Sequence, residues 1–272
     1  MLGKLLKYEF IATGRIFLPL YAALLIVSFI SSFTLQVESA ILTAVSVLLL
    51  FLAYFALFII TCFILIQRFY SNLLRDEGYL MFTLPTTPSA LIASKLITAG
   101  FWCILSIKVG ALAMLIISRV FVDIGWIISE MFANVPYVLN YVPVFFIVLL
   151  VILFLVYLAL VILHIYFSLA VGQLPPFGRY KILGAIVTYI GFSVLMQIVG
   201  SALVMGVGAY FNSVAFDSLI FYHPIHPFGT ELDMVWGVVN SLLVGTIIFH
   251  LVFAAGAFIG TSLILKKKLN LE

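Results

Sequence analysis

Residues 144–163 read VFFIVLLVILFLVYLALVIL, a stretch without a single charged side chain. An α-helix rises about 1.5 Å per residue, so about 20 apolar residues cross the roughly 30 Å hydrocarbon core of a bilayer. The stretch also lacks the alternation of apolar and polar residues that is typical of a transmembrane barrel strand. It therefore predicts an α-helical membrane protein.

The composition of the whole chain agrees with this prediction. Of the 272 residues, 65% are hydrophobic and 8% are charged, and the mean hydropathy is +1.33. A soluble domain carries about 25% charged residues, so the composition excludes an ordinary soluble domain. A net charge of +3 is too small to indicate a nucleic acid partner. Cys62 and Cys103 both lie in apolar runs, where we expect buried thiols without a redox or metal role.

Five more apolar windows accompany the first, and clusters of polar residues, proline or glycine separate them. We expect spans near residues 16–36, 41–67, 95–120, 141–171, 182–211 and 236–265. The predicted fold is all-α. It is a single transmembrane domain, 1–272, with six transmembrane helices, an N-terminal interfacial helix and a cytoplasmic coupling helix between spans two and three.

Basic residues near the span ends predict the orientation, because cytoplasmic loops carry an excess of Lys and Arg. With the N-terminus inside, the cytoplasmic side receives Lys4, Lys7, Arg15, Arg68, Arg75, Lys95, Arg179, Lys181, Lys266, Lys267 and Lys268. Both termini are then cytoplasmic, which agrees with an even number of spans.

The first 15 residues have the pattern of a helix that lies on a membrane surface. At about 100° per residue, Lys4 and Lys7 share one face. The opposite face carries Leu2, Leu5, Leu6 and Phe10. Glu9 falls inside this apolar arc and needs either a partner, for which Arg75 is one candidate, or access to water.

Residues 68–94 form the longest segment expected on the cytoplasmic side, and a segment of this length in so short a chain indicates a purpose. Arg68–Gly78 has a helix-forming composition that ends at a glycine. Thr87 and Pro88 then supply a cap and a first helical residue for the helix that enters span three. The segment is either a docking element for a cytosolic partner or an ordinary solvated loop.

Lys108 is the one basic residue expected deep in a span. It lies thirteen residues after Lys95, or about 20 Å along the helix, past the middle of the bilayer. Intramembrane charges are costly and usually face a bundle interior or an aqueous path. Two interpretations remain open: Lys108 is structural, by snorkelling or by bonding to carbonyls, or it lines a substrate path.

Motifs of catalysis are absent from the sequence. It contains no GxxxxGK[ST] phosphate loop and no HExxH, CxxC or GxSxG motif. We therefore expect no catalytic residue, no metal site and no cofactor on this chain. His164, Gln197 and His250 lie in spans, where a neighbouring helix can satisfy their polar groups.

Two motifs carry a resemblance to a known family. Leu6–Phe10 reads LKYEF, and Arg75–Pro85 reads RDEGYLMFTLP between spans two and three. Together with six spans and both ends inside, these residues resemble the permease subunits of bacterial ABC-2 type exporters. The likeness is closest to Gram-positive versions, which include exporters of antimicrobial or cytolytic peptides.

The resemblance implies partners and a function. A second permease subunit, identical or different, pairs with the chain, and a separate cytosolic ATPase binds ATP and Mg. Arg75, Asp76, Glu77 and Gly78 are expected to dock on that ATPase, and the N-terminal helix with Lys4, Lys7 and Glu9 is expected to lie along the inner leaflet. The substrate path is expected to be lined by Phe51, Tyr54, Phe55, Tyr189, Met196 and Gln197.

These expectations describe an exporter in the bacterial plasma membrane that moves an amphipathic or hydrophobic cargo outward. The family motifs do not cover Lys108. The main alternative is a membrane scaffold or immunity protein that moves no substrate. An ion-coupled transporter is disfavoured, because the spans lack inverted repeats and acidic residues near the midplane.

Overall fold

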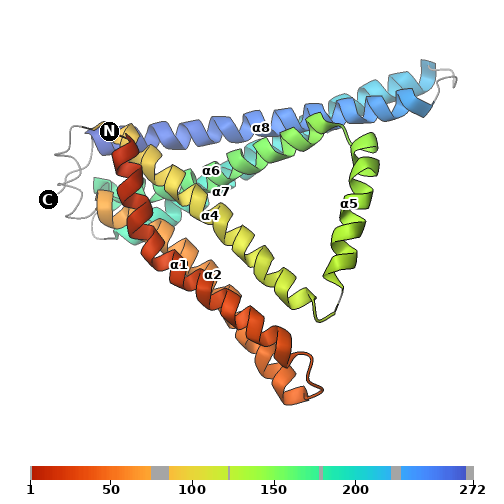
Figure 1. Ribbon diagram of the computed structural model, residues 1–272. Coiled ribbons are helices and arrows are strands. Elements are labelled where there is room, and N and C mark those ends of the chain that lie inside the picture. The colour runs from red at the N-terminus through yellow and green to blue at the C-terminus, as the bar shows by residue number, and fades with distance from the viewer. Residues whose placement is uncertain (1, 75–85, 122, 178–179, 222–227, 268–272) are drawn as a thin grey trace. The chain divides into compact units, whose positions relative to one another are not determined.

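The computed structural model describes residues 2–74, 86–121, 123–177, 180–221 and 228–267, and the structural statements below concern these residues. Every regular element among them is helical. The chain divides after Tyr141 into two compact units (Figure 1).

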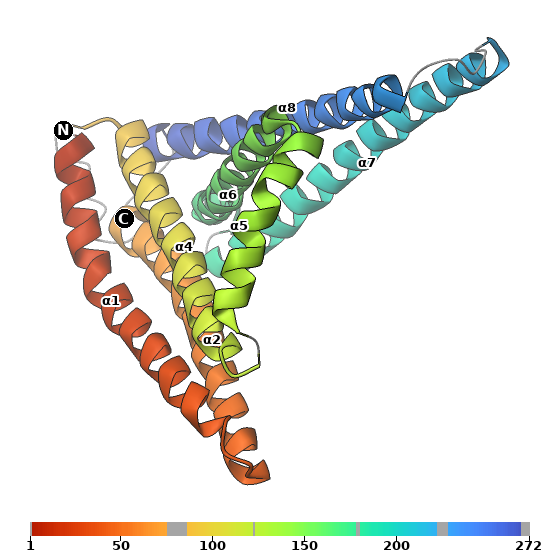
Figure 2. The ribbon, with the colours of Figure 1, turned by 45° about the vertical axis from the view of Figure 1, so that its right-hand side comes forward.

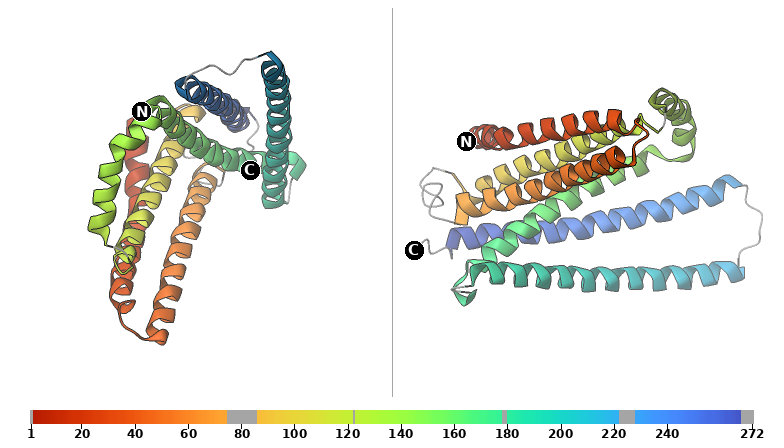
Figure 3. Two further views of the ribbon diagram at one scale, coloured as in Figure 1. Left: turned by 90° about the vertical axis from the view of Figure 1, so that its right-hand side faces the viewer. Right: turned by 90° about the horizontal axis from the view of Figure 1, so that it is seen from below.

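Unit 1 contains α1 (Leu2–Thr34), α2 (Ala40–Leu74), α4 (Pro88–Ser118) and α5 (Ile124–Tyr141). Helices α1, α2 and α4 pack on one another and run side by side (Figure 2). Unit 2 contains α6 (Val144–Gly172), the short 3-10 helix η1 (Pro175–Phe177), α7 (Lys181–Phe221) and α8 (Phe228–Lys267). Helix α6 packs against both α7 and α8 (Figure 3).

Six helices are long and apolar enough to span a membrane, which confirms the six predicted spans. The spanning segments are Leu2–Thr34, Ala40–Leu74, Pro88–Ser118, Val144–Gly172, Lys181–Gly206 and Trp236–Lys266. Residues 2–15 are helical, and they continue into the first span without a break. The N-terminal segment and the first span are therefore one helix.

The segment between spans two and three is shorter than the sequence indicates. Residues 68–74 form the last turns of α2, and residues 75–85 lie outside the described residues. The predicted restart of the helix is confirmed. Thr87 is the N-cap of α4, its side chain accepts a hydrogen bond from the backbone N–H of Ala90 at 3.4 Å, and Pro88 is the first helical residue.

Trp102 of α4 lies at the centre of the core of unit 1. Its indole is buried and stacks on Phe17 of α1, with ring centroids 4.7 Å apart and planes inclined by 7°. A Cβ on Gly14 would lie 3.5 Å from the indole, which is an ordinary van der Waals contact, so α1 packs closely on the ring at this level. The Tyr21 hydroxyl donates to the Trp102 carbonyl oxygen at 3.2 Å and lies 2.8 Å from the Ser106 hydroxyl. Aromatic packing thus joins α1 to α4.

Unit 2 depends on small residues where its helices approach closely. A Cβ on Gly172 would lie 2.5 Å from the carbonyl oxygen of Lys181, so only glycine fits where α6 ends beside the start of α7. A Cβ on Gly260 would lie 2.7 Å from the ring of Phe167 of α6. In the Gly256-Ala-Phe-Ile-Gly260 pattern, Gly260 therefore makes the close contact, whereas the space around Gly256 is open.

Candidate functional site

A buried ion pair joins the ends of three helices in unit 1. Lys95 Nζ of α4 donates to Glu9 Oε1 of α1 at 2.7 Å, and both side chains are buried. Asn72 Nδ2 of α2 donates to the same Glu9 oxygen at 3.4 Å. A buried carboxylate is tolerated when a cation and hydrogen-bond donors satisfy it, and this site supplies both.

The helical pattern of α1 explains why Glu9 points inward. Glu9, Thr13 and Phe17 recur every four residues on the buried face, whereas Lys4 and Lys7 are exposed. The Thr13 hydroxyl donates to the Glu9 carbonyl oxygen at 2.7 Å. Phe10, from the apolar arc of the predicted interfacial helix, packs edge-on against Phe101 of α4 with ring centroids 5.0 Å apart, whereas Leu2 of the same arc is exposed.

The sequence predicts that Glu9 needs a partner, and the structure supplies Lys95. Arg75, the candidate partner, lies outside the described residues, and the observed cation is Lys95. Glu9 does not depend on water either, because its carboxylate is buried. The two residues are 86 positions apart in the chain, so no local pattern connects them.

The ion pair lies close in sequence to both ends of the predicted docking segment. Helix α2 ends at Leu74, two residues after Asn72, and α4 begins at Pro88, seven residues before Lys95. Leu73 and Leu74 are buried, so the last turn of α2 is packed. The four predicted docking residues, Arg75, Asp76, Glu77 and Gly78, lie outside the described residues.

The predicted path residues of α2 fall on different sides of the helix. Phe51 and Phe55 are exposed, and their rings lie 6.1 Å apart with planes inclined by 12°. Phe58, one turn further along the same face, is also exposed. Tyr54 instead faces α4, where its hydroxyl donates to the Gly110 carbonyl oxygen at 2.9 Å. The structure thus brings Phe51 and Phe55 together and separates Tyr54 from them.

Lys108 is exposed on the surface of α4. Within the described part of unit 1, its ammonium has no ion-pair or hydrogen-bond partner. No contact in this part of the structure therefore supports the interpretation that Lys108 bonds to backbone carbonyl oxygens. The Lys108 ammonium is therefore accessible at the surface of α4.

The predicted path residues of α7 lie in unit 2. Tyr189 stacks on the buried His164 of α6, with ring centroids 4.1 Å apart and planes inclined by 8°. His164 Nε2 lies 3.1 Å from the Tyr189 carbonyl oxygen, so the neighbouring helix satisfies the imidazole. Met196 is half-buried, and Gln197 is exposed. His250 is bonded within its own helix, because its Nδ1 lies 2.7 Å from the Thr246 carbonyl oxygen.

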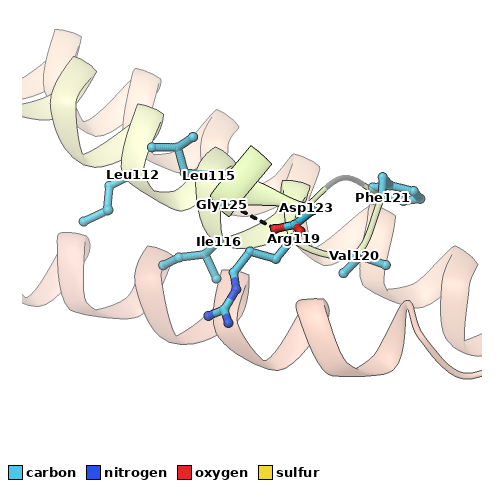
Figure 4. Close-up of a pocket in the computed structure, with 8 residues that line it drawn as sticks. All are labelled: Leu112, Leu115, Ile116, Arg119, Val120, Phe121, Asp123 and Gly125. Atoms are coloured by element: carbon cyan, nitrogen blue, oxygen red, sulfur yellow. Dashed lines mark hydrogen bonds between the residues drawn. The ribbon is translucent and has the colours of Figure 1, made fainter. Parts of the chain in front are cut away.

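Sequence reasoning missed a pocket at the far end of α4 and the helix that follows it. The open pocket has a volume of about 860 Å³ (Figure 4). It is lined by Leu112, Leu115, Ile116, Arg119, Val120, Phe121, Asp123 and Gly125. The predicted spans 95–120 and 141–171 leave the residues between them without a predicted helix, whereas the structure contains α5 there. The strong amphipathic pattern of Ile124–Tyr141 is the signal that identifies this helix.

The chemistry of these sites is that of packing, charge and surface contact. In the ranges that the structure describes, no group of three His, Cys, Asp or Glu side chains is arranged to hold a metal ion. No family model, curated protein or solved structure matches the chain.

Proposed function

We propose that the chain is the permease subunit of an ABC-2 type exporter in the bacterial plasma membrane. It moves an amphipathic or hydrophobic cargo, such as an antimicrobial or cytolytic peptide, outward across the membrane. A separate cytosolic ATPase binds ATP and Mg and supplies the energy, and a second permease subunit completes the path. The proposal adds these partners to the observed set of six apolar helices.

The observation that carries the proposal is the Glu9–Lys95–Asn72 cluster, which lies close in sequence to both ends of residues 75–85. It links both helices that flank residues 75–85 to α1. A force on that segment would therefore reach α1, α2 and α4 together instead of bending one helix end. Such a rigid connection is what a transporter needs when its energy comes from another subunit.

The proposed mechanism is alternating access or a squeezed channel. Closure of the ATPase dimer pushes the docked residues Arg75–Gly78. The push passes through Pro85 to the capped start of α4 at Thr87 and tilts that helix. Because the buried ion pair lies two turns into α4, the tilt is shared with α1.

The surfaces of the predicted path residues support the proposed cargo. Phe51 and Phe55 offer exposed aromatic rings in unit 1, and Gln197 offers an exposed amide beside the half-buried Met196 in unit 2. Apolar and aromatic surfaces with few polar groups suit an amphipathic cargo better than a sugar or an ion.

Reversal of the docking charges should abolish assembly with the ATPase. We expect the affinity-purified wild-type chain to carry a subunit with a P-loop, identified by mass spectrometry, and its Mg-ATPase activity. Asp76→Lys combined with Glu77→Lys should lower that activity at least tenfold, because two attractive contacts become repulsive. Glu130→Lys, an exposed change on α5, is the matched control and should retain the ATPase.

Two results would contradict the proposal. In one, the intact chain carries no ATPase when it is purified in mild detergent. The membranes for this purification come from cells that express every neighbouring gene product. The other is equal ATPase activity in the docking variant and in Glu130→Lys. The first result would favour the non-transporting scaffold or immunity protein, which needs no energy source.

A further inference from the structure

Helix α5 has two chemically different sides. At about 100° per residue, Met131, Phe132 and Val135 share one side, and Trp126, Glu130 and Asn134 share the other. No other helix of the described chain is as amphipathic. Among the side chains of this face that the structure describes, Phe132 is 74% exposed and Met131 66% exposed. An amphipathic helix needs a partner for such a face.

The capping of α5 shows that the helix is a local feature of the sequence. Asp123 Oδ1 accepts a hydrogen bond from the Gly125 backbone N–H at 2.8 Å, which satisfies one of the free donors at the helix start. Helix α5 follows the spanning helix α4 after a short link, and two residues separate Tyr141 from the spanning helix α6. Because both neighbours in sequence are spans, both ends of α5 are held near a membrane surface.

Pro136 interrupts the hydrogen-bond ladder of α5, as Pro19 does in the spanning helix α1, so proline alone does not decide between hydrocarbon and its surface. Pro136 has no N–H, so the helix lacks the hydrogen bond that would satisfy the Phe132 carbonyl oxygen. Glu130 and the amide of Asn134, which donates to the Glu130 carbonyl oxygen at 2.8 Å, favour a wet surface on one side.

Arg119 adds charge complementarity to this surface. Its side chain is exposed and lines the pocket between the end of α4 and the start of α5 (Figure 4). Asp123 uses one oxygen to cap α5, and no acidic group lies within 4.0 Å of the Arg119 guanidinium in the described part of unit 1. The apolar residues Leu112, Leu115 and Ile116 continue the pocket along α4. A guanidinium above an apolar wall matches a lipid phosphate above its acyl chains.

We propose that α5 is a membrane-surface helix whose partner is phospholipid. Its side with Met131, Phe132 and Val135 lies at the boundary between headgroups and acyl chains, and Arg119 binds a lipid phosphate at the same level. The surface is opposite to the Glu9–Lys95 pair along α4, since Lys95 is near the start of that helix and Arg119 follows its end. The proposal does not depend on export.

Spin labels on two adjacent residues test the position of α5. In a background with Cys62→Ala and Cys103→Ala, labels are attached to Val135→Cys and, as the matched control, to Asn134→Cys. The full chain is placed in vesicles of phosphatidylcholine and phosphatidylglycerol. We expect the Val135 label to collide severalfold more with oxygen than with a water-soluble nickel complex, and the Asn134 label to show the opposite preference.

Other outcomes would overturn the proposal. Equal access of both labels to the nickel complex would indicate a helix in water, and an immobile Val135 label inaccessible to both reagents would indicate a protein partner. Arg119→Glu should raise nickel access at the Val135 label at least twofold, because it places a carboxylate among lipid phosphates, whereas Arg119→Lys should not. An unchanged Arg119→Glu variant would refute the phosphate contact.

Discussion

Replacement of Lys95 by methionine should lower the free energy of unfolding by about 3–5 kcal/mol, because it leaves the buried Glu9 carboxylate without its cation. The other donor in the described residues, Asn72 Nδ2, lies 3.4 Å from the carboxylate and carries no charge. Unfolding by sodium dodecyl sulfate in mixed micelles, followed by circular dichroism, measures the loss. The effect should be large because a single substitution disturbs the ends of three helices.

A double variant separates the ion pair from packing. Glu9→Met combined with Lys95→Met removes both charges and should be more stable than Lys95→Met alone, since no unpaired charge remains. Lys7→Met, on the exposed side of α1, should change stability by less than about 0.5 kcal/mol. If Lys95→Met costs no more than Lys7→Met, Glu9 is satisfied in another way and the account of the three helix ends is wrong.

Truncation of Trp102 should have an effect of similar size on unit 1. Trp102→Ala removes a buried ring that stacks on Phe17, and we expect a loss of about 3–5 kcal/mol in the free energy of unfolding from the cavity and the lost contacts. In a membrane the loss comes from packing, because lipid is as apolar as the core. The same detergent titration measures it.

Smaller changes at Trp102 and a control variant show whether the predicted loss of stability comes from the packing of the indole ring. Trp102 Nε1 is buried without a hydrogen-bond partner in the described residues, so Trp102→Phe breaks no bond and should cost less than about 1.5 kcal/mol. Trp126→Ala, on the exposed surface of α5, should cost little. Equal losses in Trp102→Ala and Trp126→Ala would show that the stack on Phe17 does not hold α1 to α4.

The fold follows closely from local features of the sequence. Long apolar runs predict the six spans because hydrocarbon leaves a helix little alternative. The cap at Thr87 is equally local, since its side chain bonds to a backbone group three residues away. Helix α5 is less evident, because polar residues and Pro136 interrupt its stretch of sequence, although the period of its apolar residues indicates a helix.

The site depends on contacts that no local pattern reveals. The sequence shows that Glu9 needs a partner, but many cations are equally plausible until α4 is placed beside α1. The sequence also does not show how a spanning helix is rotated about its axis, because an apolar span has few polar residues to mark its faces. In α2, Tyr54 faces Gly110 whereas Phe51 and Phe55 are exposed. The orientation of Lys108 on the surface of α4 belongs to the same class.

Transport into inverted membrane vesicles tests the central claim most directly. Vesicles from cells that express the chain with its ATPase and second permease subunit receive a fluorescent amphipathic peptide and Mg-ATP. An outward exporter faces the reverse way there, so the account predicts that peptide accumulates inside the vesicles. Accumulation should require both the chain and ATP, and the combined Asp76→Lys and Glu77→Lys variant should abolish it. Equal accumulation with and without the chain, or with and without ATP, would contradict the account.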